Sequence, residues 1–151
     1  MSRLAKFLEL SWPERRCFLF ALVLLPMTAL SLRLFGFQRT HAAMAGTGFS
    51  GATADGITLS RARKTARIVT AAARYGPHRA TCLPISLVLV RLLHRRGIDA
   101  DLRLGVSKAA PGIEAHAWVE HRGMPLVENQ DVHERFAVFD KAVSPGAAAP
   151  R

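Results

Sequence analysis

The fold of this chain is decided around the stretch Thr81-Cys82-Leu83-Pro84-Ile85-Ser86, where the pattern predicts that a helix begins. Pro84 suits a first helical turn, because the N–H that proline lacks would have no partner there in any case. An apolar run continues to Leu93 and ends in cations followed by Gly97, which is typical of a helix C-terminus. The sequence therefore predicts an apolar helix with a cysteine in its first turn.

The position of Cys82 allows two interpretations. A thiol at a helix N-terminus faces unpaired backbone N–H groups and the positive end of the helix dipole, which favour the reactive thiolate. The alternative is a buried structural cysteine that behaves as a small hydrophobic residue. The position alone does not separate the two, so the choice depends on the residues that follow the helix.

The segments after Gly97 alternate apolar and polar residues, which is typical of half-buried strands. The pattern predicts strands over residues 100–106, 114–120 and 124–128, and a last strand over residues 132–139. The residues His121-Arg122-Gly123 predict a three-residue hairpin loop with glycine at the left-handed position. The chain would then contain a small sheet after the apolar helix.

The hairpin places a histidine, His116, beside a polar residue of the next strand. The three-residue loop would pair His116 with Glu128, so that a carboxylate lies next to the imidazole. A two-residue turn would pair it with Asn129 instead, and Asp131 is a third candidate if the strand ends early. A base beside a thiol accepts its proton, and a third group orients the base. The parts of a cysteine nucleophile site are therefore present in the chain.

Five short motifs between Ser60 and Asp140 carry a resemblance to a known family. They are Cys82-Leu-Pro-Ile-Ser-Leu, Leu92-Leu-His-Arg-Arg-Gly-Ile, Leu104-Gly-Val, Ala115-His-Ala-Trp-Val-Glu and Glu134-Arg-Phe-Ala-Val-Phe. Together they resemble the transglutaminase-like domain of lasso-peptide biosynthesis B proteins, which are leader peptidases. The resemblance implies an α+β, papain-like and transglutaminase-like core, in which a helix carrying cysteine packs on an antiparallel sheet carrying histidine and an acid.

The resemblance assigns roles to three residues. It implies that Cys82 is the nucleophile and His116 the general base of a cysteine peptidase that removes the leader from a lasso-peptide precursor. The family's acid is usually an aspartate about a dozen residues after the histidine, and that position holds Glu128 here. Glutamate can orient an imidazole, although its additional methylene changes its reach, so we place Glu128 ahead of Asp131. The backbone N–H of Cys82 is a candidate for stabilising an oxyanion.

The same resemblance implies the partners of the protein. They are the precursor peptide, a separate leader-recognition protein of winged-helix type and an asparagine-synthetase-like, ATP-dependent cyclase. We expect no cofactor in this chain, since it contains no phosphate-binding loop. We also expect no metal, because no pair of histidines has the spacing of a zinc site. Four of the other histidines, His78, His94, His121 and His133, are interpreted as surface or helix-end residues.

Two alternative functions remain open. A true transglutaminase would use the same thiol and imidazole but would pass the acyl group to a lysine amine rather than to water. A non-catalytic scaffold of a peptide-maturation complex would use the fold for binding only. Trp118, two residues after His116, points to the same face of its strand, where it would either wall the site or fill the core.

The composition of the chain limits which of these functions are possible. The 151 residues suffice for one domain with a real core, and the two cysteines, Cys17 and Cys82, do not indicate a disulfide framework. With 21 Lys and Arg against 11 Asp and Glu, the net charge is +10. Such a charge is typical of a nucleic-acid binder, a membrane-surface protein or a binder of acidic partners. No nucleic-acid-binding motif accompanies it, so we predict no nucleic-acid partner.

The N-terminal part differs in character from the rest. Ser11 and Glu14 predict a helix start, with a helix over residues 13–34 after a shorter one over residues 4–10. Residues 17–32 carry no charge, but this apolar stretch is shorter than the roughly 20 residues of a spanning helix, and Pro26 predicts a kink. Packing on the core, membrane contact through residues 1–38 and a cleaved signal remain the three alternatives. Since the leader substrate is cytoplasmic, we expect a cytoplasmic protein, with membrane association as an open alternative.

The chain is accordingly divided into four parts. Residues 1–41 form an apolar helical extension, and the Gly- and Ala-rich residues 42–56 form a linker. Residues 57–140 form the transglutaminase-like cysteine protease core, which opens with a helix that ends near Tyr75. Residues 141–151 form a flexible tail.

Overall fold

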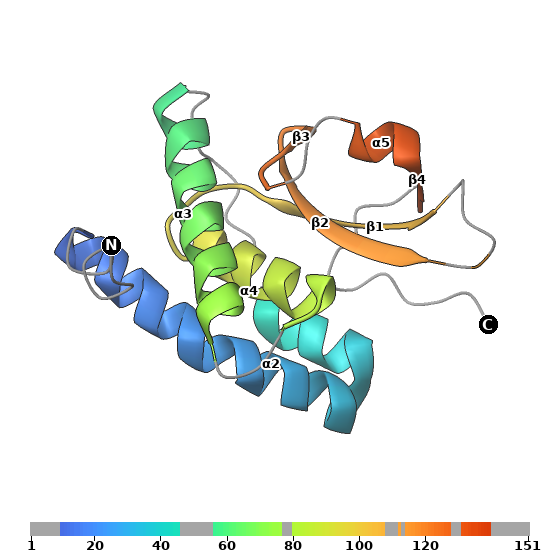
Figure 1. Ribbon diagram of the computed structural model, residues 1–151, viewed down its shortest axis with the longest axis horizontal. Coiled ribbons are helices and arrows are strands. Elements are labelled where there is room, and N and C mark those ends of the chain that lie inside the picture. Colours follow the sequence, from blue (N-terminus) through green and yellow to red (C-terminus); the bar gives the residue numbers. More distant parts are fainter. Residues whose placement is uncertain are drawn as a thin grey trace.

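The structure, a computed structural model, describes residues 10–45, 56–76, 80–107, 112, 114–127 and 131–139. Its elements in chain order are α2 (Trp12–Ala45), α3 (Gly56–Tyr75), α4 (Cys82–His94), β1 (Asp101–Ser107), β2 (Ala115–His121), β3 (Met124–Pro125), α5 (Val132–Arg135) and β4 (Phe136–Val138). The three long helices lie on one side of the sheet and α5 lies on the other (Figure 1). The predicted α+β fold is confirmed.

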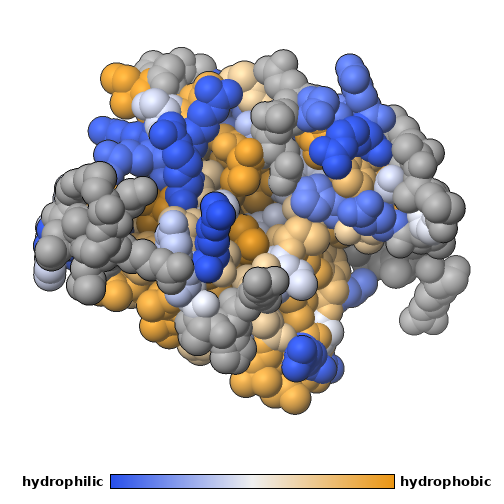
Figure 2. Space-filling view, in the orientation of Figure 1, coloured by the Kyte–Doolittle hydropathy of each residue, from blue (hydrophilic) through white to orange (hydrophobic). Residues whose placement is uncertain are grey.

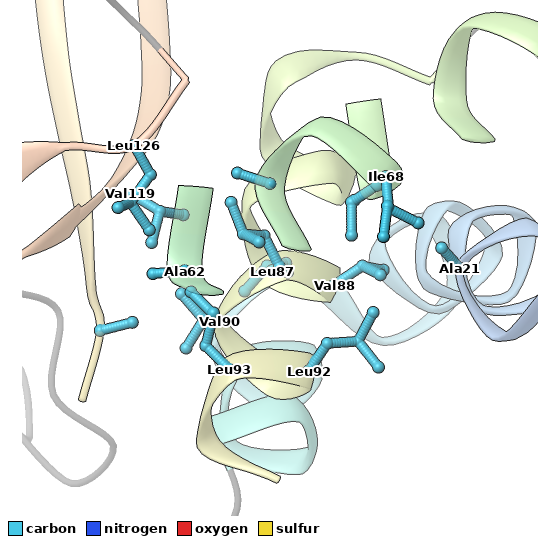
Figure 3. Packing of buried hydrophobic residues seen from close by; sticks show 14 of the residues in the cluster. Ala21, Ala62, Ile68, Leu87, Val88, Val90, Leu92, Leu93, Val119 and Leu126 are labelled. Atoms are coloured by element: carbon cyan, nitrogen blue, oxygen red, sulfur yellow. The ribbon is translucent and has the colours of Figure 1, made fainter. Parts of the chain in front are cut away.

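The core is built around α4, which begins at Cys82 as the sequence predicts. Its Leu87, Leu89 and Leu93 are almost fully buried. Residues of α2 and α3 contact it from one side and residues of β2 from the other (Figure 3). A helix enclosed in this way has to be apolar on most of its circumference, and this explains the nearly unbroken apolar run in its sequence. Gly97 follows the helix with a φ of 70°, the left-handed conformation expected past a helix end.

The sheet is antiparallel with the strand order β3-β2-β1-β4. The predicted three-residue hairpin loop is wrong, because His121 pairs with Met124 and leaves a two-residue turn. The turn residues Arg122 and Gly123 have φ values of 52° and 76°. Two consecutive positive φ values define the tight turn whose twist matches that of the flanking strands. The third predicted strand is also shorter than expected, since β3 spans only Met124–Pro125, although the N–H of Leu126 still donates to the carbonyl oxygen of Val119.

The last predicted strand begins later than expected. Residues Val132–Arg135 form the helical turn α5, and only Phe136–Val138 form the strand β4. Val132 and Phe136 are both buried, whereas Glu134 is exposed. A continuous strand would have placed all three side chains on one face. The helical turn buries Val132 and Phe136 without burying the carboxylate of Glu134.

The helix α2 begins where the sequence predicts. The backbone N–H of Ser11 donates to the carboxylate of Glu14 over 2.6 Å, which is one half of a capping box. The ammonium of Lys64 on α3 lies 2.5 Å from the same carboxylate. Hydrogen bonds from Lys64 and Ser11 lower the pKa of Glu14 to about 2. These contacts fix the N-terminal end of α2 against α3.

The far end of α2 departs from the prediction. Helical backbone continues to Ala45, and it is interrupted at Gly36 (φ 76°, ψ 177°), while Pro26 lies inside the helix. Gly36 tolerates this φ because it has no Cβ, and the chain folds back so that the hydroxyls of Ser31 and Thr40 lie 2.8 Å apart. Residues 42–45 of the predicted linker are therefore helical. The predicted short helix, most of the linker and the tail lie outside the described residues, and the division into domains stays a prediction.

Candidate active site

The thiol of Cys82 lies at the first residue of α4 and is partly buried. Thr81 precedes it in extended conformation and makes no side-chain capping bond. The backbone N–H groups of the first turn are therefore not satisfied by the residue that usually caps them. Such a helix start attracts negative charge, whether on a thiolate or on a developing oxyanion.

A buried hydrogen bond attaches the beginning of α4 to β2. The hydroxyl of Ser86 donates to the carbonyl oxygen of Ala117 over 3.1 Å. Ser86 and Cys82 are four residues apart and share one face of the helix. Ala117 directly follows His116 in β2. The contact therefore brings the first turns of α4, with Cys82, next to the segment of β2 that carries the predicted base.

The carbonyl oxygen of Ala117 that Ser86 binds lies on the edge of β2 that faces β3. The last bond between these two strands runs from the N–H of Leu126 to the carbonyl oxygen of Val119. The carbonyl of Ala117 points to the same edge, because backbone groups two residues apart in a strand face the same neighbour. Helix α4 therefore contacts β2 at this edge through Ser86.

The imidazole of His116 lies among aromatic rings. Its ring centroid is 5.0 Å from that of Phe136, at an interplanar angle of 29°, and 6.0 Å from that of Trp118, at 19°. Trp118, Val132 and Phe136 form a small buried cluster, which together with His116 we call the aromatic cluster. Trp118 fills this cluster, as one of its two predicted roles requires, and its ring lies beside the imidazole; whether it walls a catalytic site stays a prediction.

Alternation along β2 decides which side chains face α4. Ala117 and Val119 lie in the main core with α4, and His116 and Trp118 lie on the opposite face with α5 and β4. A contact between the thiol of Cys82 and the imidazole of His116 therefore has to run around the edge of β2 that faces β3. The hydrogen bond from Ser86 to Ala117 lies at that edge.

A carboxylate that the sequence does not single out lies under the aromatic cluster. Glu120 is 1% exposed. Its oxygens accept hydrogen bonds from Nε1 of Trp118 at 2.8 Å and from Nε of Arg103 at 3.0 Å, and Nε2 of His133 lies 3.1 Å away. A buried carboxylate is stable only with partners of this kind. The sequence signal was the alternation His116, Trp118, Glu120, which places all three side chains on one face.

Glu120 is too far along the strand to orient His116 directly. Four residues of a β-strand span roughly 13 Å, well beyond a hydrogen bond. It can act on the imidazole only through Trp118, whose indole N–H it binds and whose ring stacks with His116. Glu120 is therefore a candidate positioning residue for His116, acting through Trp118.

Glu128, the residue predicted to orient His116, lies outside the described residues, and so does the alternative Asn129. Extending the observed two-residue turn would place Asn129, not Glu128, opposite His116. Asp131, the third candidate, is exposed directly before α5. The identity of the orienting group stays a prediction.

The remaining histidines have different environments. The prediction of a surface residue is wrong for His121, which is buried and has Nδ1 2.6 Å from the carbonyl oxygen of Asp99. His94 lies at the end of α4 with Nε2 3.0 Å from the carbonyl oxygen of Ala100. His78 lies outside the described residues. Within the described ranges, no three His, Cys, Asp or Glu side chains are grouped as a metal site would require.

The second cysteine, Cys17, lies in the main core and is 4% exposed. Burial raises its pKa, because a thiolate loses hydration there. A neutral, buried thiol is a structural residue. Cys82 is therefore the better candidate of the two for a nucleophile.

The comparison with known families defines the class of this protein. A family model described as the transglutaminase-like superfamily matches residues 21–140, and the chain belongs to that superfamily. The match includes most of α2 as well as α4 and the sheet, so the apolar helix lies largely within the family's domain. No curated protein and no solved structure matches the chain.

Proposed function

We propose that this protein is a cysteine peptidase that removes the leader from a lasso-peptide precursor. The Ser86–Ala117 hydrogen bond carries the proposal, since it joins the start of α4 to the His116 segment of β2. Membership of the transglutaminase-like superfamily supports acyl chemistry at a cysteine. The resemblance of the five short motifs to lasso-peptide B proteins supports the leader peptidase among the activities of that superfamily.

The chemistry proceeds in two steps. His116 accepts the proton of Cys82, and the thiolate attacks the peptide carbonyl at the end of the leader. The backbone N–H of Cys82 stabilises the oxyanion, and His116 donates its proton to the leaving amine, so that the C–N bond breaks and a thioester remains. Water then attacks the thioester while His116 takes its proton. The C–S bond breaks, the leader leaves as a carboxylic acid, and His116 returns the proton to the sulfur of Cys82. In this proposal Glu128 orients the imidazole.

The partners follow from the same proposal. A separate leader-recognition protein of winged-helix type presents the precursor, and an ATP-dependent, asparagine-synthetase-like cyclase uses the amine that cleavage exposes. This chain contributes hydrolysis and requires no ATP. The proposed reaction takes place in the cytoplasm, where the precursor is made.

The test is leader cleavage of the precursor encoded beside this gene, followed by mass spectrometry with the leader-recognition protein present. Wild type should cleave, and Cys82→Ala and His116→Ala should lose cleavage by a factor of at least about 1000. Cys17→Ala is the matched control and should retain cleavage, since Cys17 is a core residue. Equal activity of wild type and Cys82→Ala would remove the nucleophile assignment.

One observation favours a second candidate, a non-catalytic scaffold. His116 lies on the face of β2 opposite the α4 core, so the thiol and the imidazole face each other only around a strand edge. In that case Cys82→Ala would bind the precursor and the leader-recognition protein as wild type does, and neither wild type nor the variant would cleave the precursor. Incorporation of a fluorescent primary amine into a glutamine peptide would instead identify a transglutaminase.

The orienting group is tested by comparing Glu128→Ala, Asn129→Ala and Asp131→Ala in the same cleavage assay. The true orienting residue should cost about 10- to 1000-fold in kcat and little in KM, because it acts on the base rather than on substrate binding. We propose the largest loss for Glu128→Ala. A loss of activity confined to Asn129→Ala would indicate that the observed hairpin register continues to the site, with Asn129 opposite His116.

A further inference from the structure

The helix α2 exposes a continuous apolar face. Its members are each about half exposed or more, and we call them the outer face of α2: Trp12, Leu19, Phe20, Val23, Met27, Leu30, Leu34 and Phe35. Leu19, Val23, Met27, Leu30 and Leu34 recur at intervals of three or four residues, which places them on one side of the helix, and Phe20 adjoins Leu19. Figure 2 shows apolar surface along the lower part of the molecule, where α2 lies in Figure 1. Apolar surfaces of this extent mark contact sites.

The opposite face of α2 is already used by the fold. Cys17, Ala21 and Leu25 are buried against α3 and α4. The Glu14–Lys64 ion pair and the bond from Arg91 to the carbonyl oxygen of Ala43 attach α2 near both of its ends. The helix therefore cannot rotate to bury its outer face, and that face stays exposed among the described residues.

Exposed arginines border the outer face at both ends. Arg16 precedes the uncharged stretch, and Arg33 and Arg39 follow it. The guanidinium of Arg95 lies 5.7 Å from the ring centroid of Phe20, which adds a cation beside the middle of the face. The whole chain carries a net charge of +10. A second copy would bring these arginines against their equivalents, whereas an anionic lipid surface would complement them.

By length and composition α2 is also the one helix of the described residues that could cross a bilayer. Its packing argues against that orientation. The neighbouring helix α3 exposes Arg61, Arg63, Lys64 and Arg67. If α2 spanned the bilayer with α3 attached, these charges would enter hydrocarbon, which excludes them. Lying in the interface plane instead buries the outer face and leaves α3 in water.

We propose that the outer face of α2 binds the surface of a membrane that contains anionic phospholipids, with α2 parallel to the membrane plane. The apolar side chains enter the boundary between headgroups and acyl chains. The bordering arginines contact lipid phosphates. This inference does not depend on the peptidase chemistry, and a protein with an inactive Cys82 should bind the same membranes.

The first experiment measures flotation of the full chain with vesicles of phosphatidylcholine containing phosphatidylglycerol. Val23→Gln with Met27→Gln should weaken binding at least about tenfold, because two anchoring side chains are lost. Val127→Gln is the matched control, since this valine is 46% exposed but lies just beyond β3. Because the three substituted side chains are exposed, circular dichroism should show the wild-type fold in each variant.

The second experiment separates charge from apolar burial. Arg33→Gln and Arg39→Gln should each weaken binding to the anionic vesicles about fivefold, and high salt should weaken wild-type binding as well. Arg122→Gln, in the β2–β3 turn, is the control and should bind as wild type does. Vesicles of phosphatidylcholine alone should bind wild type much more weakly than the anionic vesicles.

Three results would overturn the proposal. The first is vesicle binding that the Val23→Gln and Met27→Gln pair leaves unchanged. Another is that wild type forms a dimer in sedimentation velocity, that the double substitution dissociates this dimer, and that wild type does not bind vesicles. The partner of the outer face of α2 would then be a second copy of the chain. The last is resistance of the membrane-bound protein to alkaline carbonate extraction, which would show that α2 spans the bilayer.

Discussion

The two faces of β2 differ sharply in chemistry. Ala117 and Val119 pack into the main core with the three long helices. His116, Trp118 and Glu120 face the other way, into an aromatic and charged environment formed with β4 and α5. One strand thus joins an apolar core that stabilises the domain to a polar layer that carries the proposed base. We expect substitutions on the first face to reduce stability and substitutions on the second to reduce activity more than stability.

Leu87→Ala should have the largest effect on stability. The side chain of Leu87 is 1% exposed in the main core, and truncation of such a leucine costs about 2–5 kcal/mol. Urea denaturation followed by circular dichroism measures the change. Leu34→Ala is the control, since Leu34 is 65% exposed and should cost far less. Similar losses for both leucines would contradict the assignment of the core.

Glu120→Ala should combine a smaller loss of stability with a larger loss of activity. It leaves the buried Nε1–H of Trp118 without its acceptor, which costs about 1–3 kcal/mol. Because Trp118 then loses its fixed orientation against His116, kcat for leader cleavage should fall while KM changes little. Glu120→Gln retains an acceptor for the indole and should recover most of the activity. Unchanged kcat in Glu120→Ala would show that the layer is purely structural.

Gly105→Ala tests the same layer from the neighbouring strand. Gly105 pairs with His116, and an added Cβ would meet two ring atoms of Trp118 at 3.0 Å and the carbonyl oxygen of Ala137 at 3.1 Å. Because backbone and a packed ring yield little, we expect a cost of about 1–2 kcal/mol and reduced leader cleavage. Gly112→Ala meets no atom within 4 Å and serves as the control. Thermal unfolding and the cleavage assay together measure the effect.

The two thiols should differ in reactivity without any change of structure. Burial raises the pKa of Cys17, so its thiolate fraction at pH 8 is below that of an ordinary cysteine and increases only at higher pH. Iodoacetamide should therefore modify Cys82 at least about tenfold faster than Cys17 in the folded protein, and urea should abolish the difference. Peptide mass spectrometry identifies the modified residue. Equal rates in the folded protein would contradict the packing of α2 on the core.

The predictions succeeded where a local pattern was sufficient. The start of α4 at Cys82, the strand of His116 and the helix start at Ser11 all depend on residues within one or two turns, and the structure confirms them. The hairpin prediction failed because two- and three-residue turns share the same Arg-Gly signal, and one residue of difference shifts the whole register. The prediction of the last strand failed because burial of Val132 and Phe136 favoured a helical turn over a strand with alternating side chains.

By itself, the sequence determined where the helices α2 and α4 and the strand β2 begin, and the residue types of the proposed site, since helix caps and periodicity act over short distances. Only the tertiary structure decided which groups meet. Glu120 is buried because Arg103, Trp118 and His133 supply donors from three segments, and no local pattern contains that information. The outer face of α2 is exposed for a related reason. Helical periodicity cannot tell which side of an almost wholly apolar helix the rest of the fold will cover.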